Sequence, residues 1–315
     1  MPMVIYQYPS EEKPNIPDCV LALGFFDGVH IAHRDLIATA RECAKVRGLK
    51  FGIFTFASAG KIKESSGRIY GDEEKADIFE GLGADFAVFA DFSAISGATP
   101  EQFVKNMLWR DLKCRVCVAG FNFKFGRGAS GDATALSALM KECGGEAIIR
   151  EEIKSEDGRT LSATLIRELI TSGKIDAANK ILGIPYNIKG RVLHGRAVGR
   201  GMGFPTLNVE VGEDRVIPPL GVYASAISID GRIYLGVTNL GVCPTFEKRK
   251  IHLETHVLDY EGDLYGREIN TFLLGFIREE RTFSSPEELK MQINVDKNRA
   301  IKEFGDIKWQ ELGLK

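Results

Sequence analysis

Two histidines, His30 and His33, stand three residues apart just after two glycines, Gly24 and Gly28. The glycines let the backbone approach a phosphate closely, and they precede a predicted helix whose free N–H groups attract anions. Residues at i and i+3 share a helix face, so both imidazoles can donate hydrogen bonds to one phosphate. This pattern predicts electrostatic stabilisation of a phosphate during its transfer. The alternative is a pair of surface histidines at a helix start, which the glycine context disfavours.

A second glycine-rich segment lies in the C-terminal half, where four glycines fall between residues 195 and 203. A loop of this composition can wrap phosphates with its backbone. Thr206 and Asn208 then alternate onto one side of a predicted strand. Their oxygens suit a Mg²⁺ that keeps most of its waters and binds nucleotide phosphates. From composition alone, a glycine-rich hairpin without a ligand explains the segment equally well.

The first half of the chain alternates strand and helix patterns, which predicts a parallel sheet with helices on both faces. Ligands of such sheets bind at the carboxyl ends of the strands. The predicted strands are 20–23, 51–56, 86–89, 116–119 and 147–149, and the predicted helices are 35–46, 73–82, 100–112 and 133–142.

The second half changes character, and its short strands separated by turn residues predict a small antiparallel β-barrel. Two helices, 162–172 and 176–182, precede it, and a helix from Ser285 to Phe304 closes the chain. The predicted barrel strands are 188–192, 207–211, 222–229, 233–237, 252–258 and 268–274. We therefore expect two domains, 1–184 and 185–315.

The overall composition excludes several classes of protein. A formal net charge of −2 over 315 residues gives no general attraction to nucleic acid or anionic membranes. We see no signal peptide and no membrane-spanning run, and we expect a cytoplasmic protein. Six cysteines do not make a disulfide scaffold in a chain of this length. Cys114 and Cys117 fall on one predicted strand, where residues three apart point to opposite faces, so we expect ordinary core thiols.

Three segments of the first half resemble known motifs. Residues 24–33 resemble the phosphate site of the HxGH nucleotidyltransferase superfamily, which has a Rossmann-like fold, and Leu161–Arg167 resembles its ISSTxIR motif. Gly120–Gly126 resembles a stretch of the bacterial bifunctional riboflavin kinase/FMN adenylyltransferase family, also called prokaryotic FAD synthetase. The resemblance implies catalytic roles for His30 and His33. It implies nucleotide or phosphate binding by Gly24, Phe25, Asp27, Gly28, Ser162, Thr164 and Arg167, and flavin binding by Asn122 and Phe125.

The second half resembles the riboflavin kinase motif of the same family over residues 190–208, with further matches along nearly all of the predicted barrel. The resemblance implies that Glu254 is the catalytic base for the 5′-hydroxyl of riboflavin, and that Arg278 lies near the flavin. It implies metal binding by Thr206 and Asn208. The residues implied in nucleotide or phosphate binding are Gly195, Gly199, Arg200, Gly203, Pro205, Thr206 and Asn208.

The resemblance implies two sequential reactions that use ATP and Mg²⁺. The barrel would phosphorylate riboflavin to FMN, and the N-terminal domain would adenylylate FMN to FAD with release of pyrophosphate. We expect small-molecule partners alone, without nucleic acid or membrane, and a monomer or weak homo-oligomer. One alternative is a monofunctional riboflavin kinase with a degenerate first domain, motivated by Ala32, Ala163 and the missing Pro-His-Pro stretch at residues 57–60. Another is a flavin- or nucleotide-binding regulator without turnover.

Overall fold

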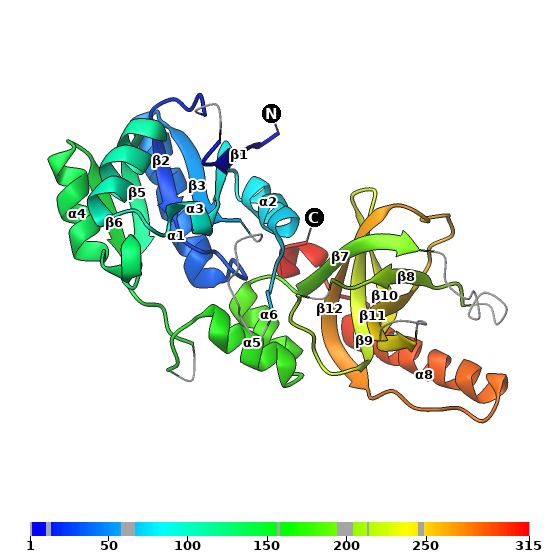
Figure 1. Cartoon of the computed structure of the whole chain (residues 1–315). Helices are drawn as coiled ribbons and strands as arrows, with labels where there is room; N and C mark the ends of the chain where they lie inside the picture. Colours follow the sequence, from blue (N-terminus) through cyan, green and yellow to red (C-terminus); the bar gives the residue numbers. More distant parts are fainter. Residues whose placement is uncertain are drawn as a thin grey trace. The chain divides into compact units, whose positions relative to one another are not determined.

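The chain forms two compact units. The computed structural model describes residues 2–10, 14–57, 67–155, 158–193, 204–212, 214–244 and 249–314. The first unit ends at Ala163, and the second begins at Thr164 and also takes in Arg68. Figure 1 traces the elements of each unit along the sequence.

The first unit is built on a six-stranded sheet in which every strand pair is parallel, as predicted. The strands run in the order β1-β4-β3-β2-β5-β6. Their bounds are β1 Val4–Tyr8, β2 Cys19–Leu23, β3 Lys50–Phe56, β4 Phe86–Ala90, β5 Cys114–Gly120 and β6 Glu146–Arg150.

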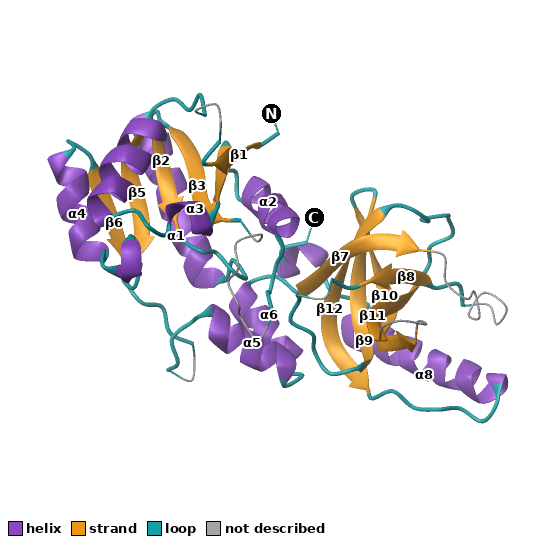
Figure 2. Ribbon diagram, in the orientation of Figure 1, coloured by secondary structure: helices purple, strands orange, loops and turns teal. Residues whose placement is uncertain are grey.

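Helices cover both faces of this sheet, as the alternating pattern predicted (Figure 2). One face packs against a π-helix and α4, which share an apolar core with the strands. The other face packs against α1 and α2. Their bounds are α1 Ile31–Arg47, α2 Asp72–Gly81, α3 Phe92–Ile95, the π-helix Gln102–Asp111 and α4 Ala133–Glu142.

Strand β1 was not predicted from the sequence. It is the edge strand beside β4, and its side chains are exposed or only partly buried along its length. Val4 and Ile5 are 48% and 50% exposed. Because an edge strand needs no continuous buried run, its five residues lack the apolar signal that marked the central strands.

The strand order reverses at β2, which has β3 on one side and β5 on the other. Loops that follow the strands at such a reversal open into the crevice where α/β proteins bind ligands. The loop after β2 runs from Gly24 to His30, and α1 begins at Ile31, four residues earlier than expected. The predicted phosphate-handling segment therefore lies at the position that this topology favours.

The prediction that Cys114 and Cys117 point to opposite faces of their strand was wrong. In the pairing with β2, Cys19 faces Cys114 but Val20 faces Val116, so Arg115 forms a β-bulge. The extra residue turns both thiols into the same apolar core. Burial, followed by interaction with the Cys117 thiol, raises the pKa of Cys114 well above its usual value, so the thiol stays protonated. Among the described residues, no three His, Cys, Asp or Glu side chains gather in a way that could hold a metal.

The second unit contains a closed six-stranded barrel in which each strand pair is antiparallel, as predicted. The strands run in the order β10-β11-β8-β7-β12-β9. Their bounds are β7 Tyr186–Leu193, β8 Leu207–Glu210, β9 Gly221–Ile229, β10 Arg232–Pro244, β11 Arg249–Val257 and β12 Glu268–Arg278. Strands β10 and β12 continue beyond their predicted ends, which brings Asn239 and Arg278 into the barrel wall.

In the described part of the second unit, three α-helices accompany the barrel, namely α5 Ala163–Thr171, α6 Ile175–Leu182 and α8 Pro286–Phe304, all close to their predicted ranges, and a 3-10 helix, Trp309–Leu312, follows α8. The side chain of Asn179 on α6 donates to the carbonyl of Leu273 on β12 and accepts from the N–H of Tyr186. Helix α6 therefore packs with the barrel, and the compact units divide about twenty residues before the expected boundary at 184/185. Ser285 caps the start of helix α8, which lies against β9, β10 and β12.

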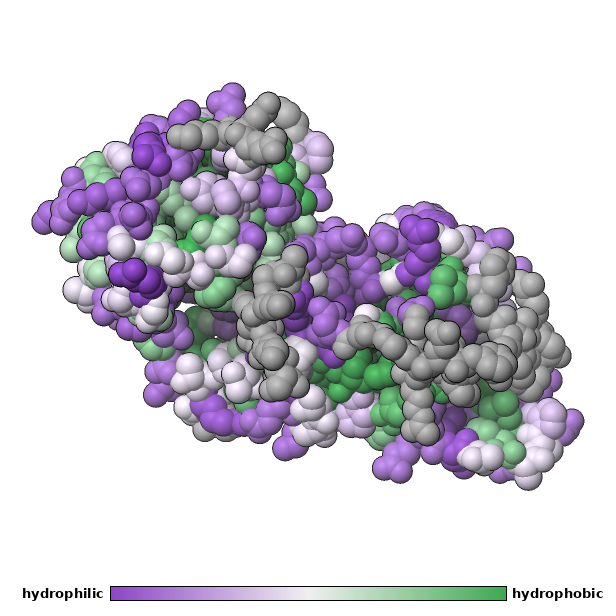
Figure 3. Space-filling view, in the orientation of Figure 1, coloured by the Kyte–Doolittle hydropathy of each residue, from purple (hydrophilic) through white to green (hydrophobic). Residues whose placement is uncertain are grey.

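The visible face of the molecule is largely hydrophilic, with hydrophobic residues gathered in smaller patches (Figure 3). In the part of the chain that the structure describes, no helix combines the length and the apolar character needed to cross a bilayer.

Candidate active sites

The loop between β2 and α1 has an unusual backbone. Gly28 has a φ of 82°, and the non-glycine residues Phe26 and Val29 also have positive φ values, 50° and 40°. Such conformations cost about 1–3 kcal/mol each for non-glycine residues and persist only where the surroundings fix them. Here the side chains of Phe26 and Val29 are completely buried. A Cβ on Gly24 would lie 2.9 Å from the Phe26 ring, so Gly24 allows this ring to pack beneath the loop.

The two histidines meet at the end of this loop, as their spacing predicted. Their rings are stacked, with centroids 3.7 Å apart and an angle of 17° between the planes. His30 is the N-cap of α1, and its Nδ1 accepts a hydrogen bond from the backbone N–H of His33 at 3.4 Å. The His33 ring also meets Phe26 edge-on. The cap and the stacking hold both imidazoles at the start of the helix.

Both imidazoles are neutral at pH 7. Burial lowers the pKa of His30 to about 4, against a smaller opposing effect of Asp27. Burial, His30 and Lys75 together hold the pKa of His33 well below its usual value. A neutral imidazole donates one hydrogen bond and accepts one. Since Nδ1 of His30 accepts from the helix backbone, its Nε2 is left to carry the proton and to donate to a ligand.

The depressed pKa of His30 predicts that the first unit becomes less stable in acid. In the unfolded chain His30 binds a proton near pH 6.5, whereas in the folded unit it does so only near pH 4. The free energy of unfolding is therefore highest above pH 6.5 and decreases as the pH falls from 6.5 to 4. The loss is on the order of 3 kcal/mol. Urea unfolding followed by Trp109 fluorescence in a Trp309→Phe background measures it. A His30→Asn variant that shows the same acid loss would contradict this assignment.

Three further side chains fix the loop. The carboxylate of Asp27 accepts a hydrogen bond from the backbone N–H of Ile69 at 3.2 Å. The carbonyl of Phe25 accepts from Thr55 Oγ1 at 2.8 Å and from Lys75 Nζ at 3.3 Å. Sequence reasoning missed Thr55 and Lys75. Both lie far along the chain from the loop, and no local pattern links them to it.

Aromatic side chains surround the carboxyl ends of three strands in this unit. The Phe25 ring lies 4.5 Å from that of Phe56 at the end of β3 and 6.3 Å from that of Phe92 after β4. Phe25 and Phe92 remain 43% and 39% exposed. These three phenylalanines, the aromatic edge, form a partly exposed surface beside the histidine loop.

The two residues predicted to bind flavin in this unit lie in different environments. Asn122 is exposed in the turn after β5. Phe125 is only 6% exposed and packs against Phe103 and Phe123 in the core. Its position gives Phe125 a packing role, and its contact with flavin stays a prediction.

The residues of the expected phosphate-binding motif lie around the start of α5. Ser162 directly precedes the helix and is partly buried, and Thr164 is exposed in its first turn. Arg167 is buried, and its Nε donates to the carbonyl of Gly67 at 2.9 Å. Thr164 and Arg167 belong to the second unit. Their role in phosphate binding stays a prediction.

The candidate kinase residues meet on the outer wall of the barrel, where β8 pairs with β11. Glu254 on β11 lies directly opposite Asn208 on β8, and Thr206 immediately precedes β8. Leu253 and Thr255 point the other way and are buried. The Glu254 side chain is 46% exposed, which suits a carboxylate that must reach a substrate.

Two histidines flank Glu254 on the same face of β11. His252 Nε2 lies 3.2 Å from the Glu254 carboxylate, a contact that sequence reasoning did not identify. His256 donates from Nδ1 to the carbonyl of Pro205 at 3.0 Å and meets the Phe204 ring edge-on. His256 therefore holds the segment before β8 against β11. Gly195, Gly199, Arg200 and Gly203 lie outside the described residues.

Glu254 and Thr206 also line a pocket between the outer wall of the barrel and α8, which we call the α8 pocket. Its walls are partly apolar and partly charged. They comprise Phe204, Thr206, Val222, Val237, Asn239, Glu254, His256, Arg278, Glu280, Arg281, Phe283, Leu289, Ile293 and Asp296. A second pocket shares Thr206 and continues past Asn208 to the turn after β11, along Pro205, Thr206, Leu207, Asn208, Val257, Tyr260, Glu261, Gly262, Asp263, Leu264 and Tyr265.

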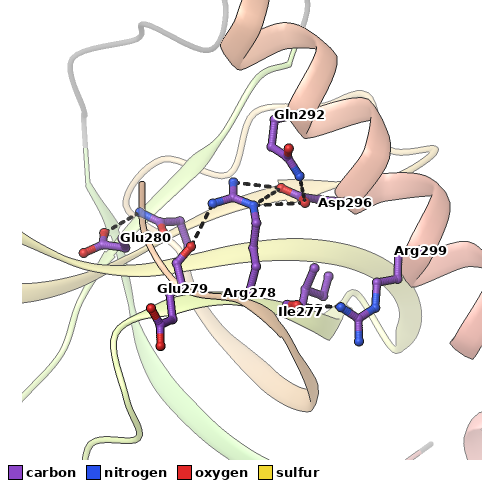
Figure 4. Close-up of polar contacts among 8 residues, drawn as sticks. Ile277, Arg278, Glu279, Glu280, Gln292, Asp296 and Arg299 are labelled. Atoms are coloured by element: carbon purple, nitrogen blue, oxygen red, sulfur yellow. Dashed lines mark hydrogen bonds and ion pairs between the residues drawn. The ribbon is translucent and has the colours of Figure 1, made fainter. Parts of the chain in front are cut away.

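The guanidinium of Arg278 is fixed within the α8 pocket (Figure 4). It reaches from the end of β12 to Asp296 on α8, with Nε and Nη2 within 3.1 Å of the carboxylate. Asp296 is 2% exposed and also accepts from Gln292 at 2.7 Å. Sequence reasoning placed Arg278 near the flavin but missed Asp296 and Gln292, because a helix and a strand end give no sign in sequence that they will meet.

Comparisons with known proteins match a different family model to each half of the chain. A family model described as FAD synthetase matches residues 12–165, and one described as riboflavin kinase matches residues 182–304. A bifunctional riboflavin kinase/FMN adenylyltransferase of Bacillus subtilis is 35% identical, covering 92% of this chain and 93% of the relative. The Escherichia coli K12 protein of the same name is 33% identical, covering 91% and 93%. The chain belongs to this bifunctional family.

Membership of the family decides between the functions that the sequence left open. Both catalytic domains are present, which supports a riboflavin kinase that is also an FMN adenylyltransferase over a monofunctional kinase with a degenerate first domain. ATP is a substrate of both reactions. The fold also matches a crystal structure described as a macrolide-efflux protein from Streptococcus pneumoniae, with 27% identity, a TM-score of 0.82 and coverage of 95% of this chain and 99% of that one.

Proposed function

We propose that riboflavin lies in the α8 pocket with its ribityl 5′-hydroxyl against Glu254. The carboxylate accepts the hydroxyl proton as the oxygen forms its bond to the γ-phosphorus of ATP and ADP leaves. The observation that carries this proposal is that Glu254, Thr206 and Arg278 line one pocket of the barrel. His252 orients the carboxylate from the same strand.

The oxygens around Asn208 suit Mg²⁺. A magnesium ion bound to nucleotide phosphates keeps several waters and needs only one or two protein oxygens. The hydroxyl of Thr206 and the amide oxygen of Asn208 meet this need, and the Glu254 carboxylate lies opposite Asn208. Bound there with ATP, the ion would neutralise charge that develops on the phosphates.

In the first unit, we assign adenylyl transfer to the loop that carries the two histidines. A phosphate oxygen of FMN attacks the α-phosphorus of ATP, and pyrophosphate leaves. The neutral imidazoles of His30 and His33 donate hydrogen bonds to the transferred phosphate, where preorganised donors stabilise the charge that develops. The exposed rings of Phe25 and Phe92 on the aromatic edge offer a stacking surface for the flavin.

The likeness to a structure described as an efflux protein does not alter this proposal, because both catalytic family models match this chain. Dependence on ATP supports a cytoplasmic location, and we expect a monomer or weak homo-oligomer that acts on riboflavin, FMN and ATP.

A product assay tests the proposed function directly. The protein is incubated with ATP and Mg²⁺, starting separately from riboflavin and from FMN, and the flavins are separated by chromatography. We expect FMN followed by FAD from the first reaction and FAD from the second. Absence of FAD in both would contradict the adenylyltransferase assignment, and unchanged riboflavin would contradict the kinase assignment.

The ion pair between Arg278 and the buried Asp296 in the α8 pocket gives a prediction of its own. Asp296→Asn should lower the free energy of unfolding of the second unit by about 3 kcal/mol, because it leaves the Arg278 charge without its ionic partner. It should also raise the KM for riboflavin. The matched control is Glu303→Gln, which removes an exposed ion pair with Arg299 on the same helix and should cost less than about 1 kcal/mol.

Urea unfolding followed by Trp309 fluorescence in a Trp109→Phe background measures both variants. Equal losses in the two would show that the Arg278–Asp296 pair does not stabilise the pocket.

A further inference from the structure

Lys75 is a lysine in an unusual place. It lies in the first turn of α2, yet it is only 5% exposed. Lysines are almost never buried to this extent without partners, because removing an ammonium from water is costly. Its Nζ donates to the carbonyl of Phe25 at 3.3 Å and to that of Phe56 at 3.4 Å. A buried charge thus joins the ends of two neighbouring strands, since Phe25 follows β2 and Phe56 ends β3.

The carbonyl of Phe25 marks the point from which the strained turn begins. The next residue, Phe26, has a positive φ, and so does Val29, which directly precedes the α1 cap residue His30. Thr55 Oγ1 donates to the same Phe25 carbonyl at 2.8 Å, and Thr55 is completely buried. Two buried donors therefore fix one acceptor at the root of the loop.

The far end of the loop is fixed separately. Nε of Arg34 donates to the carbonyl of Val29 at 3.1 Å, and Nδ1 of His30 accepts from the N–H of His33. The strained turn is thus held at both ends, and Lys75 supplies the charged contact at the end that joins the sheet. Charge-assisted hydrogen bonds are roughly twice as strong as neutral ones.

We propose that Lys75 is a positioning residue for adenylyl transfer. Its ammonium holds the carbonyl of Phe25, and so sets the course of the loop that places His30 and His33 against the transferred phosphate. This inference rests on the proposed role of the two histidines. Nothing in the local sequence around Lys75 signals the role, because its partners lie 19 and 50 residues away.

The test compares Lys75→Met with Lys105→Met in the full chain. Lys105 is an exposed lysine of the same unit, paired with Glu142. We expect Lys75→Met to lower kcat for FAD formation from FMN by about 100-fold, the cost of a misplaced catalytic group, with KM values for FMN and ATP changed less than about threefold. Riboflavin phosphorylation by the second unit and both activities of Lys105→Met should stay at the wild-type level. Lys75→Arg, which keeps a buried cation, should recover part of the lost kcat.

A second variant covers the case in which Lys75→Met fails to fold. Valine has nearly the same shape as threonine, so Thr55→Val removes only the other donor to the Phe25 carbonyl. This change should lower kcat for FAD formation by about tenfold. The inference would be overturned if Lys75→Met had a kcat within twofold of wild type, or if it raised KM without lowering kcat. It would also be overturned if Lys75→Met did not fold and Thr55→Val kept full activity. Failure of the wild-type protein to form FAD would instead refute the proposed function itself.

Discussion

Replacing Glu254 by glutamine should reduce the rate of riboflavin phosphorylation by about 100- to 10,000-fold, the range associated with loss of a general base. Glutamine keeps the size of the side chain and its place opposite Asn208, but it cannot accept the proton of the ribityl hydroxyl. FAD formation from added FMN should continue at the wild-type rate, because it uses the first unit. The measurement is the initial rate of FMN production from riboflavin and ATP.

Glu268→Gln provides the matched control for this variant. Glu268 is an exposed glutamate on β12 of the same barrel, and it is paired with Lys189. This change should leave both activities intact. If Glu254→Gln phosphorylated riboflavin within threefold of the wild-type rate, another group would have to be the base, and the proposed site on β11 would be wrong.

Replacing His30 by asparagine should reduce adenylylation of FMN by about 100- to 1000-fold, the loss that follows removal of one preorganised donor to a developing charge. Asparagine is a good N-cap, so it can still accept from the N–H of His33 and keep the helix start. The variant thus separates the chemistry of the imidazole from its capping role. Riboflavin should still be converted to FMN, which then accumulates.

His33→Asn should have an effect of similar size, because the stacked rings act on one phosphate. The rate of FAD formation from FMN at saturating ATP measures both variants, and riboflavin phosphorylation in the same samples serves as the internal control. Retention of FAD formation in both would exclude the histidines from the reaction.

Periodic patterns of apolar residues and glycine-marked loops predicted much of the architecture. The apolar runs within β2 to β6 and the turn-separated strands of the second half predicted the parallel sheet and the barrel. The spacing of His30 and His33 predicted their meeting at one helix start. In each case the geometry depends on residues close together in sequence.

Contacts between distant segments could not be predicted in this way. Asp296 on α8 pairs with Arg278 at the end of β12, and a loop separates these two elements in the sequence. His252 contacts Glu254 on one face of β11, and alternation alone does not identify that face as functional. The bulge at Arg115 depends on how β5 pairs with β2, so a regular strand was the wrong assumption for Cys114 and Cys117. Lys75 reads as a surface lysine on its own helix, and only tertiary structure shows it buried behind the loop.

The division of the two reactions between the two units is tested most directly by mixing Glu254→Gln with His30→Asn, each of which should be impaired in one reaction. Glu254→Gln alone should make very little FAD from riboflavin, and His30→Asn alone should accumulate FMN with very little FAD. An equal mixture supplied with riboflavin, ATP and Mg²⁺ should form FAD, because FMN made by one variant is adenylylated by the other. FAD from either variant alone at the wild-type rate, or no FAD from the mixture, would contradict the assignment of kinase chemistry to Glu254 and of adenylyl transfer to His30.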